Sequence, residues 1–411
     1  MTVFLAAVFG VFLIVLYRLF VTPRRTAGWV REDFVASAYG LPPREQLDSR
    51  RPGPPPPAHR AEERQAVAEA AWAGDWKPAE RYVLAAGEDW DERWARLELL
   101  QQVAREDDAW LDAWRVAEPG NCDAATLHAS MMVHRAWEIR GSGFAHEVMT
   151  SDMNRFRAML PAAIEEAREA AGLDPANPGP WVVMVTAARG AQYSRAQFRP
   201  LWAGLVARAP HHYEGHWQAL QYWCAKWFGS DRRMLRFAGQ AVRKAPPGSP
   251  LAGIYLHALN ELTDRPTPAA LPVTPMRRNL LKQVAASFDQ VTPDDERLPV
   301  LRHLLAHYML RSMMYGAALE QFRLIGPWCG AHPWREDGNP AMAFEVARGT
   351  AAKLSRTRPL PDTAGLRNRS LGGFLSITPG ARQDRQGTPR HCFLDHVRSQ
   401  MMRAARVTVP R

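Results

Sequence analysis

The sequence predicts an all-α protein in which helical hairpins stack into an elongated array, an α-solenoid. Pro175, Pro210 and Pro246 lie 35 and 36 residues apart, and each follows an Ala-rich stretch and precedes an apolar one. A period in the mid-thirties is typical of helical-hairpin repeats, which bind partners along an extended surface. No run before residue 350 shows the alternation of apolar and polar residues that a half-buried strand requires.

The N-terminal segment predicts the location of the protein. Residues 2–21 are predominantly apolar and carry a single charge, that of Arg18. A helix of this length spans about 30 Å, the thickness of the bilayer hydrocarbon core, so we expect a transmembrane anchor over residues 1–22. Arg24 and Arg25 follow, and the positive-inside rule then places the N-terminus outside and the body in the cytoplasm. The alternative is a cleaved signal peptide, but the small-residue triplet 36–38 lies well beyond the apolar run.

A proline-rich segment separates this anchor from the rest of the chain. Residues 23–58 are basic and include four consecutive prolines at positions 54–57. Such a run favours extended polyproline backbone, which acts as a semi-rigid spacer. We therefore expect residues 23–58 to be a linker.

Residues 59–350 form the predicted helical-repeat domain. Asp75 and Pro78 are the residue types that begin a helix. Leucines and other apolar residues at 298–326 suggest a late hairpin, whereas 143–157 and 263–298 lack repeat spacing and are expected to be insertions. Besides the helix that begins near Asp75, composition and helical periodicity predict helices at 61–73, 88–105, 109–117 and 123–140.

The span from about 160 to 260 resembles degenerate tetratricopeptide repeats. Trp181 and Trp217 follow Pro175 and Pro210 at the spacing of the aromatic residue that opens the first helix of a repeat. The resemblance implies a groove that binds protein or peptide partners. Two features depart from the family pattern: its first-helix glycine is absent, and Pro200 is expected to interrupt a second helix. The chain also resembles membrane-anchored bacterial helical-repeat domains of unknown function, a resemblance that implies no activity.

The C-terminal tail carries most of the positive charge. The chain has a net charge of +10, and residues 351–411 contain 12 basic and 3 acidic side chains. We expect an irregular tail with a short amphipathic helix at 393–407. Such a tail attracts anionic lipid through nonspecific electrostatics. Nucleic-acid binding through the tail is a weaker alternative, because aromatic residues for base stacking are few.

The best candidates for metal ligands are His212, Glu214 and His216. The two histidines are spaced i, i+4 and could share a helix face, which raises the alternative of a metal-dependent enzyme in a cavity of the array. However, the metalloprotease motif needs Glu directly after the first His, and Tyr213 occupies that position. His303 and His307 have the same spacing and are interpreted as packed core residues. With no phosphate-binding or nucleophile motif, we expect a protein without cofactor or catalytic activity.

Tryptophan is unusually frequent, with 15 residues. Most are expected to fill the layers between hairpins. Tyr222, Trp223, Lys226 and Trp227 are the best candidates for a partner-binding patch, because aromatic and basic side chains dominate binding hot spots. The sequence therefore predicts a protein-interaction module or scaffold at the cytoplasmic face of the membrane.

Overall fold

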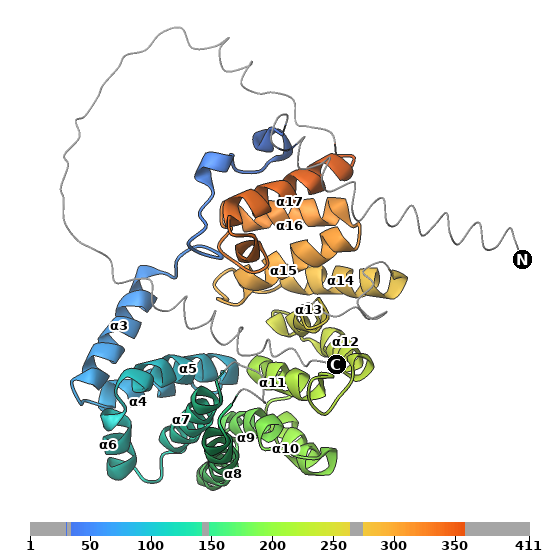
Figure 1. The fold of residues 1–411 in the computed structure, drawn as a ribbon. Helices are drawn as coiled ribbons and strands as arrows, with labels where there is room; N and C mark the ends of the chain where they lie inside the picture. Colours follow the sequence, from blue (N-terminus) through green and yellow to red (C-terminus); the bar gives the residue numbers. More distant parts are fainter. Residues whose placement is uncertain (1–29, 31–33, 142–147, 264–273, 358–411) are drawn as a thin grey trace, which may run out of the picture. The chain divides into compact units, whose positions relative to one another are not determined.

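The computed structural model describes residues 30, 34–141, 148–263 and 274–357. Within these ranges the chain forms 15 α-helices and a few short 3-10 turns, and extended backbone pairs only at one isolated bridge, between Asp48 and Trp328 (Figure 1). The predicted all-α class is confirmed.

The chain divides into two compact units. The large unit comprises residues 56–263 and 282–296 of the described chain, and the small unit comprises residues 30–55, 274–281 and 297–357. Helix α14 (Pro275–Phe288) contributes residues to both.

The large unit contains eleven complete helices. The first four are α3 (Ala58–Trp72), α4 (Lys77–Leu84), α5 (Trp90–Glu106) and α6 (Ala109–Ala117). The others are α7 (Cys122–Arg140), α8 (Thr150–Leu173), α9 (Gly179–Gly190), α10 (Arg195–Arg208), α11 (Tyr213–Trp223), α12 (Asp231–Lys244) and α13 (Ile254–Asn260).

The three periodic prolines mark equivalent positions in this unit. Pro175, Pro210 and Pro246 come just after α8, α10 and α12, and each precedes the next helix in the chain. Neighbouring helices pack together, and α9 contacts α7, α8, α10 and α11. The predicted alternation of helix, proline turn and helix is therefore present in this part of the chain.

Buried tryptophans fill the core of the first half of the large unit. Trp110 and Trp114 of α6 are almost completely buried and stack with ring centroids 6.4 Å apart. Trp76, which precedes α4, stacks on Trp114 at 6.2 Å. These tryptophans pack between helices, as the sequence predicts.

One expectation for the large unit is wrong, namely that Pro200 interrupts a helix. Helix α10 continues through Pro200. A capping box of Ser194 and Gln197 stabilises the start of the helix. Proline has no N–H to bond the backbone carbonyl one turn earlier, but Pro200 is exposed, so water can bond that carbonyl instead. The expected insertions contain helix, since α8 begins at Thr150 and α14 lies wholly within 263–298; their status as insertions in a repeat pattern stays a prediction.

The small unit contains the predicted late hairpin. Its helices are α15 (Leu298–Arg311), α16 (Tyr315–Ile325) and α17 (Pro340–Leu354), with a 3-10 turn η6 (Trp334–Asp337) before α17. Two short 3-10 turns, η2 (Ala36–Tyr39) and η3 (Arg44–Gln46), precede them in the chain.

The N-terminal segment of the small unit differs from the expected spacer. Arg348 of α17 is fully buried and donates a hydrogen bond of 2.7 Å to the carbonyl of Pro42. The amide of Asp48 bonds the carbonyl of Pro327, and the amide of Gly330 bonds the carbonyl of Arg51. Residues 34–55 are therefore packed onto the helices of this unit.

The predicted location of the protein requires correction. In the part of the chain that the structure describes, no helix is both long and apolar enough to cross a bilayer. The two longest helices, α7 with 19 residues and α8 with 24, each contain several charged side chains. The prediction of a single-pass membrane protein with a cytoplasmic body is thus contradicted. Segments 2–21 and 393–407, predicted as an anchor and an amphipathic helix, lie outside the described residues.

Candidate partner-binding site

Trp137, near the end of α7, is the centre of a cluster of aromatic and basic side chains. Its ring meets Phe156 of α8 edge-on at 5.0 Å and Trp227 at 5.9 Å. The guanidinium carbons of Arg189 and Arg140 lie 5.2 and 6.0 Å from the ring centroid. The indole N–H is buried and has no acceptor among the described residues. The cluster thus combines positive charge with an unused hydrogen-bond donor.

Gly190 explains why α9 can bring Arg189 to this indole. A Cβ atom at Gly190 would lie 2.5 Å from Leu160, 3.0 Å from Phe156 and 3.1 Å from Trp137. A glycine is therefore required for the last turn of α9 to approach α7 and α8 this closely. Arg189, the preceding residue, is consequently held beside Trp137.

Arg189 is a half-buried cation without a carboxylate partner. Its Nη1 donates a 2.5 Å hydrogen bond to Oε1 of Gln218, and no ion pair joins it to any residue in the described ranges. Burial lowers its pKa to about 10, which the more distant charges of Glu214 and Glu261 only partly oppose. The guanidinium remains protonated at neutral pH, and four of its five N–H groups are left for other acceptors.

Gln218 on α11 orients this guanidinium. Its Nε2 donates a 2.6 Å hydrogen bond to Glu214, so its carbonyl oxygen is directed to Arg189. Since a neutral amide intervenes, the carboxylate of Glu214 does not neutralise Arg189 directly. This relay holds the cation in place while leaving its charge uncompensated.

The four residues predicted as a partner-binding patch are divided between two environments. Trp227 joins the Trp137 cluster, and Lys226 forms a 2.8 Å ion pair with Glu261. Tyr222 is fully buried, stacks on Phe198 at 3.8 Å and donates a hydrogen bond to the Tyr193 carbonyl. Trp223 packs edge-on against both of these rings. Tyr222 therefore belongs to the core, and Trp227 is the predicted residue that reaches the site.

The weak metal candidates perform structural roles at the start of α11. His212 caps the helix, with Nδ1 accepting from the Gly215 amide at 3.2 Å. His216 donates to the His212 carbonyl at 2.9 Å, and burial lowers its pKa to about 4. Glu214 accepts a hydrogen bond from Gln218. Nowhere in the described ranges do three or more His, Cys, Asp or Glu side chains gather in an arrangement that could hold a metal ion.

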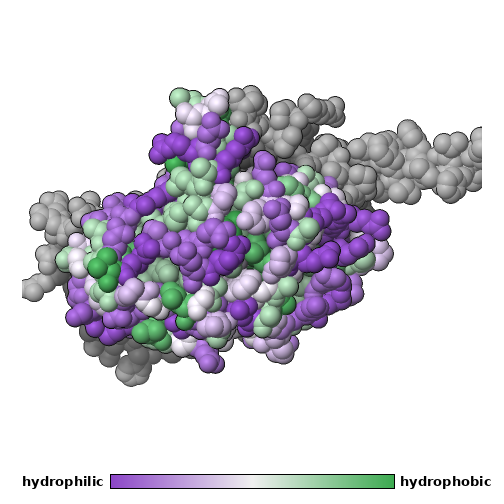
Figure 2. Space-filling model, turned by 90° about the horizontal axis from the view of Figure 1, so that it is seen from below, coloured by the Kyte–Doolittle hydropathy of each residue, from purple (hydrophilic) through white to green (hydrophobic). Residues whose placement is uncertain are grey.

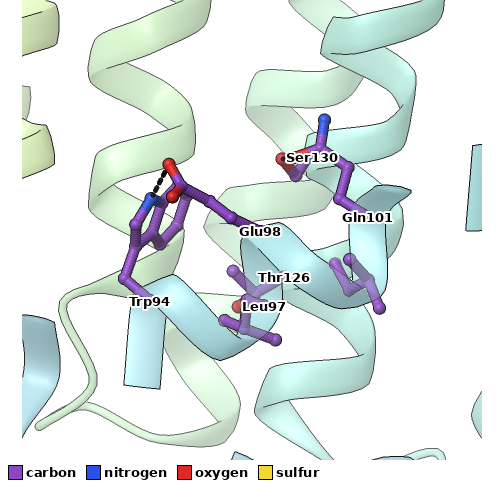
Figure 3. Close-up of a pocket in the computed structure, with 7 residues that line it drawn as sticks. Trp94, Leu97, Glu98, Gln101, Thr126 and Ser130 are labelled. Carbon is purple, nitrogen blue, oxygen red and sulfur yellow. Dashed lines mark hydrogen bonds between the residues drawn. The ribbon is translucent and has the colours of Figure 1, made fainter. Parts of the chain in front are cut away.

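A shallow depression lies between α5 and α7 and leaves no enclosed space for a water molecule (Figure 3). In it the Trp94 indole donates a 3.0 Å hydrogen bond to Glu98, and the Ser130 hydroxyl donates to Gln101 at 3.2 Å. Ser130 is paired with an amide rather than with a base, so the hydroxyl is not activated as a nucleophile. The full lining is Trp94, Leu97, Glu98, Gln101, Thr126, Leu127 and Ser130.

No protein-family model and no curated protein matches the chain. The function has to follow from the geometry of the described residues. Among them, the Trp137 cluster has the composition of a binding hot spot, with indole rings and a guanidinium held by their neighbours.

Arg189 and Trp137 were not predicted as site residues. Their local sequence gives weak signals: Arg189 ends an apolar stretch just before a glycine, and Trp137 is followed by Arg140 at i+3. What places the residues together is the packing of α7 against α9, which spacing along the chain does not reveal. Figure 2 shows that apolar residues on the face in view form small separate patches among polar ones.

Proposed function

We propose that the chain is a helical-repeat protein, a tetratricopeptide-like solenoid, that binds a partner protein and acts as a scaffold rather than as an enzyme. The observation that carries this proposal is Arg189, a half-buried cation that is held by Gln218, lies beside Trp137 and has no carboxylate partner. Arginine in such a setting favours a planar anionic group. The ligand group is a carboxylate of the partner, either an acidic side chain or a free C-terminus.

Recognition would combine two contributions. The free N–H groups of Arg189 would bind the carboxylate, and the indole rings of Trp137 and Trp227 would contact the apolar part of the same segment. Because Gln218 already orients the guanidinium, little side-chain entropy is lost on binding. A charge-assisted hydrogen bond of this kind contributes about 1.5–3 kcal/mol.

Peptide selection with the full chain tests the proposal. Two displayed peptide libraries, one with free C-termini and one with internal random segments, would be selected on the wild-type protein. We expect enrichment of Asp and Glu, or of a free C-terminus, and a loss of affinity of about 10- to 100-fold in Arg189→Gln. Arg189→Lys should retain part of the affinity because it retains the charge.

Arg199→Gln is the matched control, because Arg199 is an exposed arginine on α10. This variant should bind the selected peptides as the wild type does. Failure to enrich any peptide, or equal binding by wild type and Arg189→Gln, would refute the proposal. Circular dichroism of each variant separates loss of binding from loss of fold.

A further inference from the structure

The first helices of the large unit form an acidic end. Residues 61–118 contain 15 acidic and 7 basic side chains. Three large apolar residues are also exposed there: Val116 at 83%, Trp72 at 50% and Leu84 at 50%. The exposed acidic residues are Glu62, Glu63, Glu69, Asp75, Glu88, Asp89, Glu106, Asp107, Asp112 and Glu118.

Helices α10 and α12 form a basic face on the same unit. Residues 190–250 contain 9 basic and 2 acidic side chains, and neither acidic residue is exposed. The two helices contact each other through Trp202 and Phe237, whose ring centroids are 5.4 Å apart. The exposed cations are Arg195, Arg199, Arg232, Arg233, Arg236, Arg243 and Lys244, and none of them forms an ion pair within the described part of the chain.

These two surfaces lie at opposite ends of the large unit. Figure 1 shows α3, α4 and α6 at one end and α10 and α12 at the other. The helices between them, α7 to α9, are packed together and keep the two ends apart. Within one copy, the cations of α12 therefore cannot pair with the acidic residues of α6.

We infer that two copies of this chain associate head to tail, the basic face of one copy against the acidic end of the next. Such an interface joins two different surfaces, so each copy retains one free end and association can continue to longer chains or close into a ring. A second copy is favoured over nucleic acid because it compensates both charged surfaces, whereas a polyanion would compensate only the basic face. This site is separate from the one at Arg189.

The association should be weak and sensitive to salt. Individual exposed ion pairs contribute about 0–1 kcal/mol each, so several are needed for a measurable effect. Complementary surface charge also speeds encounter between copies, and this effect is screened beyond about 10 Å at 0.1 M salt.

Sedimentation velocity of the full chain and two charge-reversed variants tests the inference. One variant carries R232E, R233E and R236E on the basic face, and the other carries E106K, D112K and E118K on the acidic end. Wild type should self-associate at about 50 mM salt and dissociate at about 500 mM. Each variant alone should lose at least about tenfold in association constant. An equimolar mixture of the two should associate again, because each now presents the charge that the other lacks.

Restored association in the mixture distinguishes surface recognition from misfolding, since misfolded variants would not complement each other. The double variant R155E and R157E, on exposed positions of α8, should associate as the wild type does. A monomeric wild type at about 100 µM and low salt, or a mixture that fails to associate, would overturn the inference. So would a monomeric wild type that retards duplex DNA only while Arg232, Arg233 and Arg236 are present, because the basic face would then bind nucleic acid.

Discussion

The indole nitrogen of Trp334 donates a 2.8 Å hydrogen bond to Nδ1 of His303, a fully buried histidine on α15. This bond requires Nδ1 to be unprotonated, so Nε2 carries the proton and donates it to the carbonyl of Pro52 at 2.9 Å. Both ring nitrogens are thus satisfied only in the neutral form. The pair connects the N-terminal segment to α15 and to η6 within the small unit.

The neutral state of His303 should make the small unit sensitive to acid. Burial lowers the pKa of His303 to about 4, below the value of about 6.5 in an unfolded chain. The unfolded state therefore binds more protons between these values, so the stabilisation is fully present above about pH 6.5 and is lost as pH falls towards 4. At pH 5 the loss should be about 2 kcal/mol.

Hydrogen exchange of residues 298–311 at pH 7.5 and pH 5, corrected for the intrinsic rate, measures this effect. His303→Gln should destabilise the unit at pH 7.5 and should show a weaker dependence on pH than the wild type, with the remainder due to His307 of α15, whose pKa burial lowers to about 3. If the exchange rates of wild type and His303→Gln differ by the same factor at both pH values, His303 is not the cause of the acid sensitivity.

A buried ion pair should be essential to the large unit. Asp123 of α7 is 3% exposed and accepts hydrogen bonds from Arg93 of α5 and from Asn177, which precedes α9. Replacing it by Ala leaves the Arg93 cation without its partner, at a cost of about 3–5 kcal/mol. Thermal unfolding should show a large fall in Tm for Asp123→Ala. Asp112→Ala, at an exposed position of α6, is the control and should leave Tm nearly unchanged. Similar shifts in Tm for both variants would contradict the prediction.

Local sequence patterns predicted the positions of the helices better than they predicted which segments contact each other. The range 109–117 coincides with α6, and the proline spacing located the turns after α8, α10 and α12, because both signals act over a few residues. Residues 34–55 were expected to be a spacer because proline favours extended backbone, but they include the 3-10 turns η2 and η3. Their attachment depends on Arg348 and on Gly330, some 300 positions away in the chain, and composition carries no information about such contacts.

The candidate site shows the same division. Trp227 was predicted from its residue type and basic neighbour, and it does contact Trp137. Tyr222 was predicted by the same rule, but the position of its face on α11 directs it against Phe198. When a helix packs between two other helices, an aromatic residue on it can face either the core or the surface. The residue type does not determine this orientation; the packing of the neighbouring helices does.

Gly204 should tolerate no side chain. A Cβ atom there would lie 2.0 Å from the ring of Trp181, and that ring cannot move freely because Arg208 lies over it at 4.4 Å. Gly204→Ala should therefore destabilise the protein by about 1–3 kcal/mol through overpacking. Gly172→Ala, near the end of α8 with no atom within 4 Å of its Cβ, should be neutral or stabilise by up to about 1 kcal/mol. If the urea midpoints of both variants shift in the same direction, the close contact between position 204 and Trp181 does not determine stability.

Gly330 should control the attachment of the N-terminal segment. A Cβ atom at this position would lie 2.5 and 2.6 Å from the backbone nitrogen and oxygen of Arg51 and 2.6 Å from the oxygen of Ser49. Because these are backbone atoms, Gly330→Ala has to displace the segment, and we expect a cost of about 1–3 kcal/mol. The amide of Asp48, which now bonds the Pro327 carbonyl at 2.9 Å, should then exchange its hydrogen about 10- to 100-fold faster.

Gly316→Ala in α16 is the matched control, because nothing lies within 4 Å of its Cβ. Exchange across residues 34–51 should be unchanged in this control, and exchange in α9 of the large unit should be unchanged in both variants. If Gly330→Ala leaves residues 34–51 protected, the contact at Arg51 does not hold the segment. If it accelerates exchange throughout α15 to α17 as well, the segment is part of the cooperative core of the small unit rather than a strap attached to its surface.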